Sequence, residues 1–176
     1  GWRGTSLTPL SALDIALVQM LHNLQASSDE RHLWLAALAS HQWGRGHACL
    51  DLNQWPDNAG VLLGWGAQAL AALPAKLSLG LSDLPWAQGE TSPLVLEDKR
   101  LYLRRAWAAE QDIRARLMAL QQSRAAPPDL TQQLDHLFGL DPHDGQRLAC
   151  AHAAQNALTL ITGGPGTGKT TTVVKL

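Results

Sequence analysis

The fold of the final part of the chain is decided by the stretch Ala157-Leu158-Thr159-Leu160-Ile161-Thr162, followed directly by Gly163-Gly164-Pro165-Gly166-Thr167-Gly168-Lys169-Thr170. The first six residues are apolar or β-branched, which is typical of a buried parallel strand. The residues from Thr170 to Leu176 are compatible with a helix, although several of them are weak helix formers. The sequence therefore predicts a strand, a glycine-rich loop and a helix, in that order.

The glycine-rich loop fits the pattern G-x-x-x-x-G-K-[ST] of the phosphate-binding loop in P-loop NTPases. Glycines allow the backbone to curl so that successive N–H groups point at phosphate oxygens. We expect Lys169 to reach the β- and γ-phosphates and the Thr170 hydroxyl to bind Mg²⁺. The predicted ligands are ATP and Mg²⁺, with Lys169 and Thr170 as the catalytic pair.

Gln146 lies seventeen residues before Gly163, in a segment predicted to be helical. Its amide donates and accepts hydrogen bonds at once, so it can bind the N6/N7 edge of adenine. The alternative is an ordinary solvent-exposed glutamine on a helix. The residues predicted to bind the nucleotide are Gln146, Gly163, Gly164, Pro165, Gly166, Thr167, Gly168, Lys169, Thr170 and Thr171.

The composition excludes several functional classes. The chain has 176 residues, 45% of them hydrophobic, and a formal net charge of −1, so it is not a basic nucleic-acid binder as a whole. It has no long apolar run, which predicts a soluble protein without a membrane span. His41, His47 and Cys49 match no zinc pattern, and the distant Cys49 and Cys150 suggest reduced thiols in a cytoplasmic protein.

Helix signals dominate the first third of the chain. Thr8-Pro9 is a typical helix start, with Thr as N-cap and Pro at the first helical position. Ser27-x-x-Glu30 has the spacing of a capping box for a second helix, which Gly44 and Gly46 are expected to end. A short strand or an extended crossing is predicted for His47–Leu52.

The middle of the chain combines a glycine-containing helical segment with a hairpin. Asn58–Ala72 has helical character but contains three glycines. Pro93–Leu96 and Arg100–Arg104 are predicted to be antiparallel strands joined by the intervening polar residues. A helix over Arg105–Ser123 should follow, with the i,i+4 ion pairs Glu110–Arg114 and Asp112–Arg116 on its surface.

The segment Arg124–Pro128 is the clearest linker candidate, because it ends in two consecutive prolines. A short helix with Leu130, Leu134 and Phe138 is predicted after it, and a second helix over His143–Gln155 leads into the predicted strand. These boundaries predict three parts: an N-terminal subunit-interaction domain 1–124, a linker and connecting helix 125–138, and the start of a motor domain 139–176.

Several of these stretches resemble a known family. Gly139–Leu176, with its glutamine-containing helix, apolar strand and glycine loop, resembles the beginning of a superfamily-1 helicase motor. The rest is similar to RecD, the alpha subunit of exodeoxyribonuclease V. The stretches that carry this similarity are Gly44-x-Gly46 with His47–Leu50, Pro93–Leu96, Arg100–Arg105 and Trp107-x-x-Glu110.

The resemblance implies an ATP-dependent 5′-to-3′ DNA helicase subunit of a bacterial heterotrimer that acts on broken DNA ends in recombinational repair. It implies that the N-terminal domain docks the two companion subunits and that later motor domains hold the DNA. By position, Gln146 would contact adenine, Gly164–Thr171 would wrap the phosphates, Lys169 would neutralise them and Thr170 would hold Mg²⁺.

We therefore predict a mainly α N-terminal domain with a small β-hairpin, followed by the first strand, P-loop and helix of a RecA-like α/β motor that is truncated. We expect such a fragment to be inactive alone, because an acidic Mg²⁺ ligand and an arginine finger are needed as well. The alternatives are an AAA-type ATPase, a stand-alone RecD-like helicase, or a protein-interaction module with an orphaned P-loop.

Overall fold

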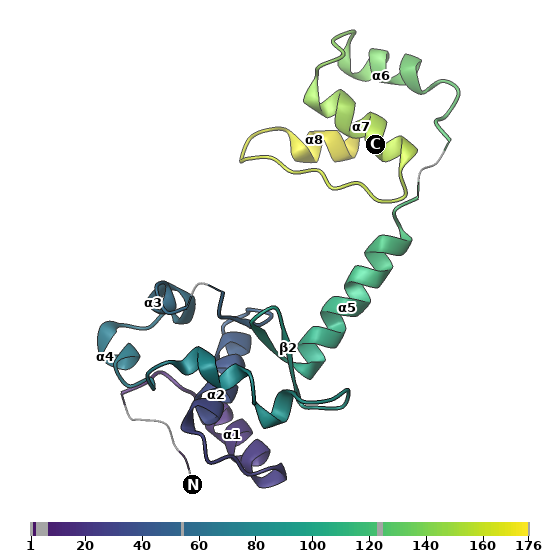
Figure 1. Ribbon diagram of the computed structural model, residues 1–176. Coiled ribbons are helices and arrows are strands. Elements are labelled where there is room, and N and C mark those ends of the chain that lie inside the picture. The colour runs from purple at the N-terminus through teal and green to yellow at the C-terminus, as the bar shows by residue number, and fades with distance from the viewer. Residues whose placement is uncertain (1, 3–6, 54, 123–124, 176) are drawn as a thin grey trace. The chain divides into compact units, whose positions relative to one another are not determined.

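The chain forms two compact units, Gly1–Gln111 and Asp112–Leu176, and the division falls within one long helix (Figure 1). The structure is a computed structural model that describes residues 2, 7–53, 55–122 and 125–175. None of the helices in this described part has the length and apolar character needed to cross a membrane. The three predicted domain boundaries stay predictions.

Helices and 3₁₀ turns make up most of both units, and the strands are short. The elements in chain order are α1 (Ala12–Leu24), α2 (Glu30–Gly44), β1 (Leu50–Asp51), α3 (Ala59–Leu63), α4 (Ala67–Leu70), the 3₁₀ helices η1 (Leu77–Leu81) and η2 (Pro85–Ala87), β2 (Leu94–Glu97), β3 (Arg100–Leu103), α5 (Arg104–Ala119), α6 (Leu130–Phe138), α7 (Gly145–Gln155) and α8 (Lys169–Val174).

The core of the first unit is built around α2. Every residue from His32 to Ser40 is buried, because α1, η1 and the sheet all pack on this helix. Trp34, at 1% exposed, meets Trp2 edge to face with ring centroids 5.1 Å apart. Trp86 is also buried and donates its indole N–H to the Gln25 carbonyl at 3.0 Å.

The predicted hairpin is confirmed, and a third strand extends it. The strand order is β1-β3-β2, with both pairs antiparallel. Asp98 and Lys99 form the two-residue turn with φ values of 48° and 59°, which suits the right-handed twist of the flanking strands. Leu94 in β2 and Leu101 in β3 are fully buried. The mainly helical N-terminal domain with a small sheet is therefore confirmed.

Both predicted helix starts in this unit are wrong by a few residues. Helix α1 begins after Ser11, which forms a capping box with Asp14: the Asp14 N–H donates to Ser11 Oγ (3.2 Å) and the Ser11 N–H to Asp14 Oδ2 (2.8 Å). Helix α2 begins after Asp29, whose carboxylate accepts from the Arg31 N–H at 2.9 Å. The capping acceptor is thus the Ser11 hydroxyl in α1 and the Asp29 carboxylate in α2, in place of the predicted Thr8 and Ser27.

The predicted helix over Asn58–Ala72 is divided into two short helices, α3 and α4. Helix α3 ends at Gly64, which adopts the left-handed conformation with φ of 65°, and α4 begins after Gly66. Glycine adopts this conformation without the steric cost that a Cβ atom imposes, so it ends the helix here. The end of α2 at Gly44 agrees with the prediction.

The second unit has its own small cluster, in which α6 packs against α7. Among the described residues this cluster consists of Leu130, Leu134 and Cys150, with Phe138 packed against it.

The predicted helix after the hairpin is α5, which ends at Ala119. Of its two predicted ion pairs, Asp112–Arg116 forms at 2.9 Å, and the ion pairs of the described residues do not include Glu110–Arg114.

The region before the glycine loop differs from the prediction. Ala125–Asp129 contains no helix or strand, as expected of a linker, while Ser123 and Arg124 lie outside the described residues. The predicted strand Ala157–Thr162 is wrong, because no residue from Leu158 to Thr162 forms a bridge and Leu160 is 80% exposed. A strand needs a partner for its backbone ladder, whereas the described backbone bond from this run to another segment is a single one, from the Ala157 N–H to the Gln122 carbonyl at 3.1 Å.

Candidate functional site

The glycine loop folds around its own lysine. Gly166 and Gly168 have φ values of 77° and 78°, so the loop curls where residues with a Cβ atom would be strained. Lys169 Nζ donates to the carbonyls of Gly163 and Gly164, each at 2.6 Å. Thr167 Oγ1 donates to the same Gly164 carbonyl at 2.9 Å. The ammonium is therefore held inside the curve of the loop.

Helix α7 brings Gln146 to this loop. A Cβ atom built on Gly168 would overlap Gln146 Nε2, so only glycine allows the amide to approach the loop this closely. Gln146 and Lys169 line one cavity of about 340 Å³ together with Gly163 and Thr167. The structure thus brings Gln146 and the glycine loop, which are separated by the rest of α7 and the segment after it, to one cavity.

The remaining predicted residues belong to the loop and to α8 and do not line this cavity. The Gly164 carbonyl accepts hydrogen bonds from Thr167 and Lys169, and Pro165 and Gly166 form the exposed tip of the loop. Thr170 and Thr171 are exposed in the first turn of α8 and do not line the cavity. The roles of all ten predicted residues in nucleotide binding stay predictions.

Six of the lining residues were not predicted, namely Asp144, Gly145, Ala149, Ile161, Thr162 and Thr172, and two of them make hydrogen bonds that shape the site. Asp144 caps α7 by accepting from the Arg147 N–H at 2.8 Å, and it lines the cavity. Thr172 is 2% exposed and donates its hydroxyl to the Gly168 carbonyl at 3.1 Å, which ties α8 to the end of the loop. An Asp directly before a helical pattern is a capping signal that could have identified Asp144, whereas burial of Thr172 depends on tertiary packing.

Cys150 lies one helical turn after Gln146 on α7 and belongs to the packed cluster, not to the cavity lining. Burial raises the pKa of its thiol, so the sulfur stays protonated, and it donates weakly to the Thr172 carbonyl at 3.7 Å. Cys150 is therefore a packing residue between α7 and α8 and not a nucleophile.

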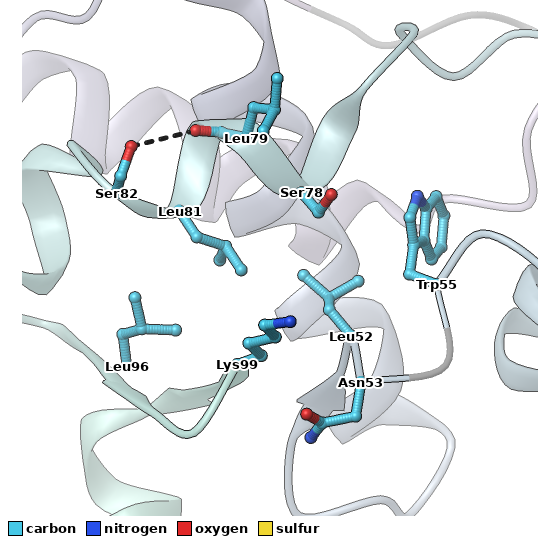
Figure 2. Close-up of a pocket in the computed structure, with 9 residues that line it drawn as sticks. All are labelled: Leu52, Asn53, Trp55, Ser78, Leu79, Leu81, Ser82, Leu96 and Lys99. Carbon is cyan, nitrogen blue, oxygen red and sulfur yellow. Dashed lines mark hydrogen bonds between the residues drawn. The ribbon is translucent and has the colours of Figure 1, made fainter.

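A second hollow, of about 390 Å³, lies in the first unit (Figure 2). Its walls are mostly apolar, from Leu52, Leu81 and Leu96 to the ring of Trp55, and Lys99 is its charged lining residue. Its residues are Leu52, Asn53, Trp55, Ser78, Leu79, Leu81, Ser82, Leu96 and Lys99. No set of acid, base and nucleophile converges among these residues, so the hollow suits an apolar group better than a chemical reaction.

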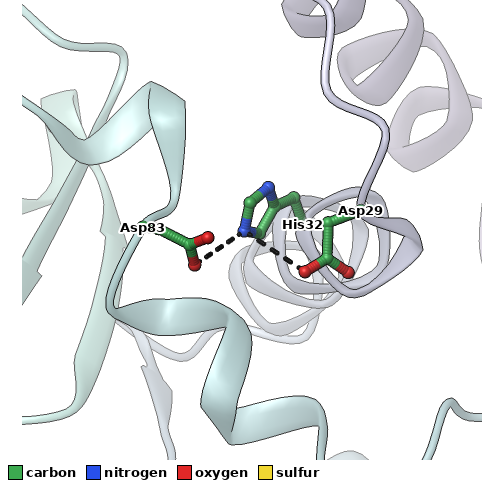
Figure 3. Close-up of side chains that lie close together, drawn as sticks. All are labelled: Asp29, His32 and Asp83. Carbon is green, nitrogen blue, oxygen red and sulfur yellow. Dashed lines mark hydrogen bonds and ion pairs between the residues drawn. The ribbon is translucent and has the colours of Figure 1, made fainter.

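A cluster of Asp29, His32 and Asp83 at the start of α2 has the side chains of a metal site (Figure 3). His32 Nε2 lies 3.2 Å from Asp83 Oδ1 and 3.8 Å from Asp29 Oδ2, and its Nδ1 lies 2.7 Å from Ser27 Oγ. The Asp29 carboxylate is already bound by the Arg31 Nε at 2.9 Å. A metal ion would have to displace that guanidinium, so we assign the cluster to stabilising the start of α2.

The fold and the site together define a mainly helical protein with a candidate phosphate-binding loop in its second unit. Residues 7–102 match the family model described as "RecBCD enzyme subunit RecD, N-terminal domain". The RecBCD enzyme subunit RecD of Mycobacterium tuberculosis (strain H37Rv) is 35% identical, with 95% of this chain and 28% of that protein covered. The proteins of the same name from Mycolicibacterium smegmatis and Haemophilus influenzae are 33% and 29% identical, over 95% and 81% of this chain and 28% and 26% of their own length.

The chain belongs to the RecD family, whose members are named as subunits of the RecBCD enzyme. It spans about 28% of the length of the first of these relatives. The resemblance inferred from the hairpin, the glycine loop and Gln146 is therefore confirmed at the level of the family.

Proposed function

We propose that the full-length protein is an ATP-dependent 5′-to-3′ DNA helicase subunit of an exodeoxyribonuclease V complex that acts on broken DNA ends in recombinational repair. The observation that carries the proposal is the convergence of Gln146 and the glycine loop on one cavity, in a chain of the RecD family. A chance glycine turn would not be expected to share a cavity with a glutamine, whose amide can donate and accept hydrogen bonds at once.

Each residue has a defined task in this proposal. Lys169 leaves the carbonyls of Gly163 and Gly164 to neutralise the β- and γ-phosphates of ATP. Thr170, exposed in the first turn of α8, holds Mg²⁺ through its hydroxyl. Mg²⁺ neutralises charge on the phosphates, while the acidic ligand of the ion and the DNA contacts come from motor regions outside this chain.

Replacing the lysine tests the phosphate site. In the full-length protein, Lys169→Ala should lower DNA- and Mg²⁺-dependent ATP hydrolysis by ~10²-fold or more, because charge on the transferring phosphoryl group loses its stabilisation. Lys99→Ala, which removes an exposed lysine from the first unit, should leave turnover unchanged. Normal turnover in the Lys169→Ala protein would show that the loop does not serve hydrolysis.

Replacing the glutamine tests the adenine contact. Gln146→Ala should weaken ATP binding by roughly 1–3 kcal/mol, the value of a bidentate amide contact to adenine. GTP and inorganic triphosphate should bind as they do to the wild-type protein, since neither offers the adenine edge. Equal weakening of all three ligands in parallel titrations would make Gln146 a structural residue.

The second function that we infer is docking of a companion subunit by the first unit, through the outer face of α1. Leu13, Leu17, Met20 and Leu24 follow one another at spacings of four, three and four residues, which places them on one stripe of the helix. Leu13, Met20 and Leu24 are 67%, 48% and 70% exposed. Asp14 is the one Asp, Glu, Lys or Arg of α1, and it is buried.

An uncharged apolar stripe of this kind suits a helix of a permanent partner, because the cores of obligate interfaces are apolar and poor in charge. The relatives are named as subunits, which favours a companion subunit as the occupant over a second copy of this chain. Residues 1–111 contain eight Lys and Arg and ten Asp and Glu, a formal net charge of −2, which leaves little counterion release for binding DNA through this unit.

Matched substitutions test this docking surface. In the full-length protein co-expressed with its companion subunits, Leu13→Asp should lower their recovery in a pull-down by about tenfold or more, because it buries an unpaired charge in the interface. Val61→Asp also replaces an apolar side chain with a carboxylate, at a position on α3 that is 84% exposed. It should leave the recovery of the companion subunits unchanged. Full recovery with Leu13→Asp, or a Leu13-dependent homodimer, would contradict the assignment.

A further inference from the structure

Two adjacent strips of the α7 surface make different contacts. Gln146 and Ala149 line the cavity, whereas Cys150 and Ala154 belong to the cluster that packs against α6. Consecutive residues of an α-helix are turned by about 100° about its axis. The direction in which Gln146 points is therefore set by how α7 is rotated against α6.

The neighbouring residue fixes that rotation. Arg147 NH2 lies 2.6 Å from Asp135 Oδ1 of α6, with the two side chains 16% and 33% exposed. Arg147 Nε is buried and has no hydrogen-bond partner among the described residues, so Asp135 is the acceptor on which this guanidinium depends. The backbone N–H of Arg147 is also held, by the Asp144 carboxylate.

Helix α6 also contacts the C-terminal end of α8, the helix that follows the glycine loop. Lys175, directly after α8, donates from Nζ to the Leu137 carbonyl at 3.0 Å and lies 4.4 Å from the centre of the Phe138 ring. One short helix thus contacts both the helix that carries Gln146 and the helix that follows the glycine loop. Because Gly168 leaves no spare room beside the Gln146 amide, a small rotation of α7 would move that amide relative to the loop.

We propose that Asp135 and Arg147 form a positioning pair that holds Gln146 in the orientation for binding adenine, and that this pair thereby sets the preference for ATP over GTP. Neither residue touches the cavity, so both act through Gln146. The proposal rests on the proposed function, because it needs a nucleotide in this cavity. Supporting residues that lock the direction of a binding side chain commonly determine specificity in this way.

The experiment is a competition titration of the full-length protein, in which ATP or GTP displaces a fluorescent ADP analogue. Asp135→Asn keeps the shape of the side chain and removes its charge, and it should lower the ATP-to-GTP affinity ratio about three- to tenfold with GTP affinity unchanged. Arg147→Lys retains the positive charge but loses the planar guanidinium with its fixed N–H donors. Its ATP-to-GTP affinity ratio should therefore lie between those of Asp135→Asn and the wild type. The matched control is Asp112→Asn, which breaks the exposed Asp112–Arg116 pair on α5 and should leave the ratio unchanged.

The double variant Asp135→Asn/Gln146→Ala separates positioning from general support. If Asp135 acts through Gln146, the double variant has the same ATP-to-GTP ratio as Gln146→Ala alone. Equal loss of ATP and GTP affinity in Asp135→Asn, or an unchanged ratio, overturns the proposal while leaving the nucleotide site intact. A wild-type protein that binds neither nucleotide overturns the proposed function itself.

Discussion

At the scale of single residues, the absence of one side-chain carbon at Gly168 permits the close approach of Gln146. Gly168→Ala would place a Cβ atom on Gln146 Nε2 and force alanine to adopt a φ of about 78°. Such backbone strain costs roughly 1–3 kcal/mol, so ATP affinity of the full-length protein should fall at least about fivefold in a binding titration. Gly44→Ala is the control, because a Cβ atom there meets nothing within 4 Å, and it should leave ATP affinity unchanged. Unaltered affinity in Gly168→Ala would mean that the loop and Gln146 do not act together.

At the scale of elements, the cap of α2 should show in the pH dependence of stability. The Arg31 side chain, by hydrogen bonding, holds the pKa of Asp29 at about 2, below its usual 3.8. The ionised carboxylate therefore stabilises the fold above about pH 4, and this contribution is lost as the pH falls towards 2. Asp29→Asn should still cap the helix but lose this acid dependence, whereas Asp29→Ala should lose about 1 kcal/mol at neutral pH as well. Urea unfolding of the chain between pH 2 and 7 measures the free energy of unfolding of the wild type and both variants. Identical pH profiles in the wild type and Asp29→Asn would refute the role of the ionised Asp29 carboxylate.

The elements also show what a sequence can predict. The hairpin, α6 and the end of α2 were predicted because their signals are local: a polar turn, an apolar repeat and a terminal glycine. The helix starts were misplaced because Ser11 and Asp29 compete with the predicted caps at a distance of a few residues. The strand Ala157–Thr162 failed because a strand depends on a partner that periodicity does not reveal. For the site, the motif gave Lys169 and the spacing gave Gln146, but Thr172 and the Asp135–Arg147 pair arise only from packing.

At the scale of the whole molecule, the two units differ in the cores that hold them. The first unit buries a large cluster that runs from Val18 to Leu101, whereas the described cluster of the second unit consists of Leu130, Leu134 and Cys150. Burial of apolar surface is the main source of stability, at roughly 25 cal/mol for each Å². The second unit should therefore unfold at lower temperature or urea concentration than the first.

The tryptophans make this difference measurable, because all seven lie in the first unit, between Trp2 and Trp107. Tryptophan fluorescence of the 176-residue chain should report only the later transition, while far-ultraviolet circular dichroism should report both, with the early one invisible to fluorescence. If the glycine loop binds ATP, then ATP with Mg²⁺ should shift only the early transition to a higher temperature or urea concentration. At a ligand concentration about one hundred times the dissociation constant, the free energy of unfolding of the second unit should rise by about 2.7 kcal/mol. Lys169→Ala should remove that shift without changing the fluorescence transition. Coincident transitions by the two probes would mean that the units unfold as one cooperative body, and a delay of the fluorescence transition alone would place the ligand in the first unit.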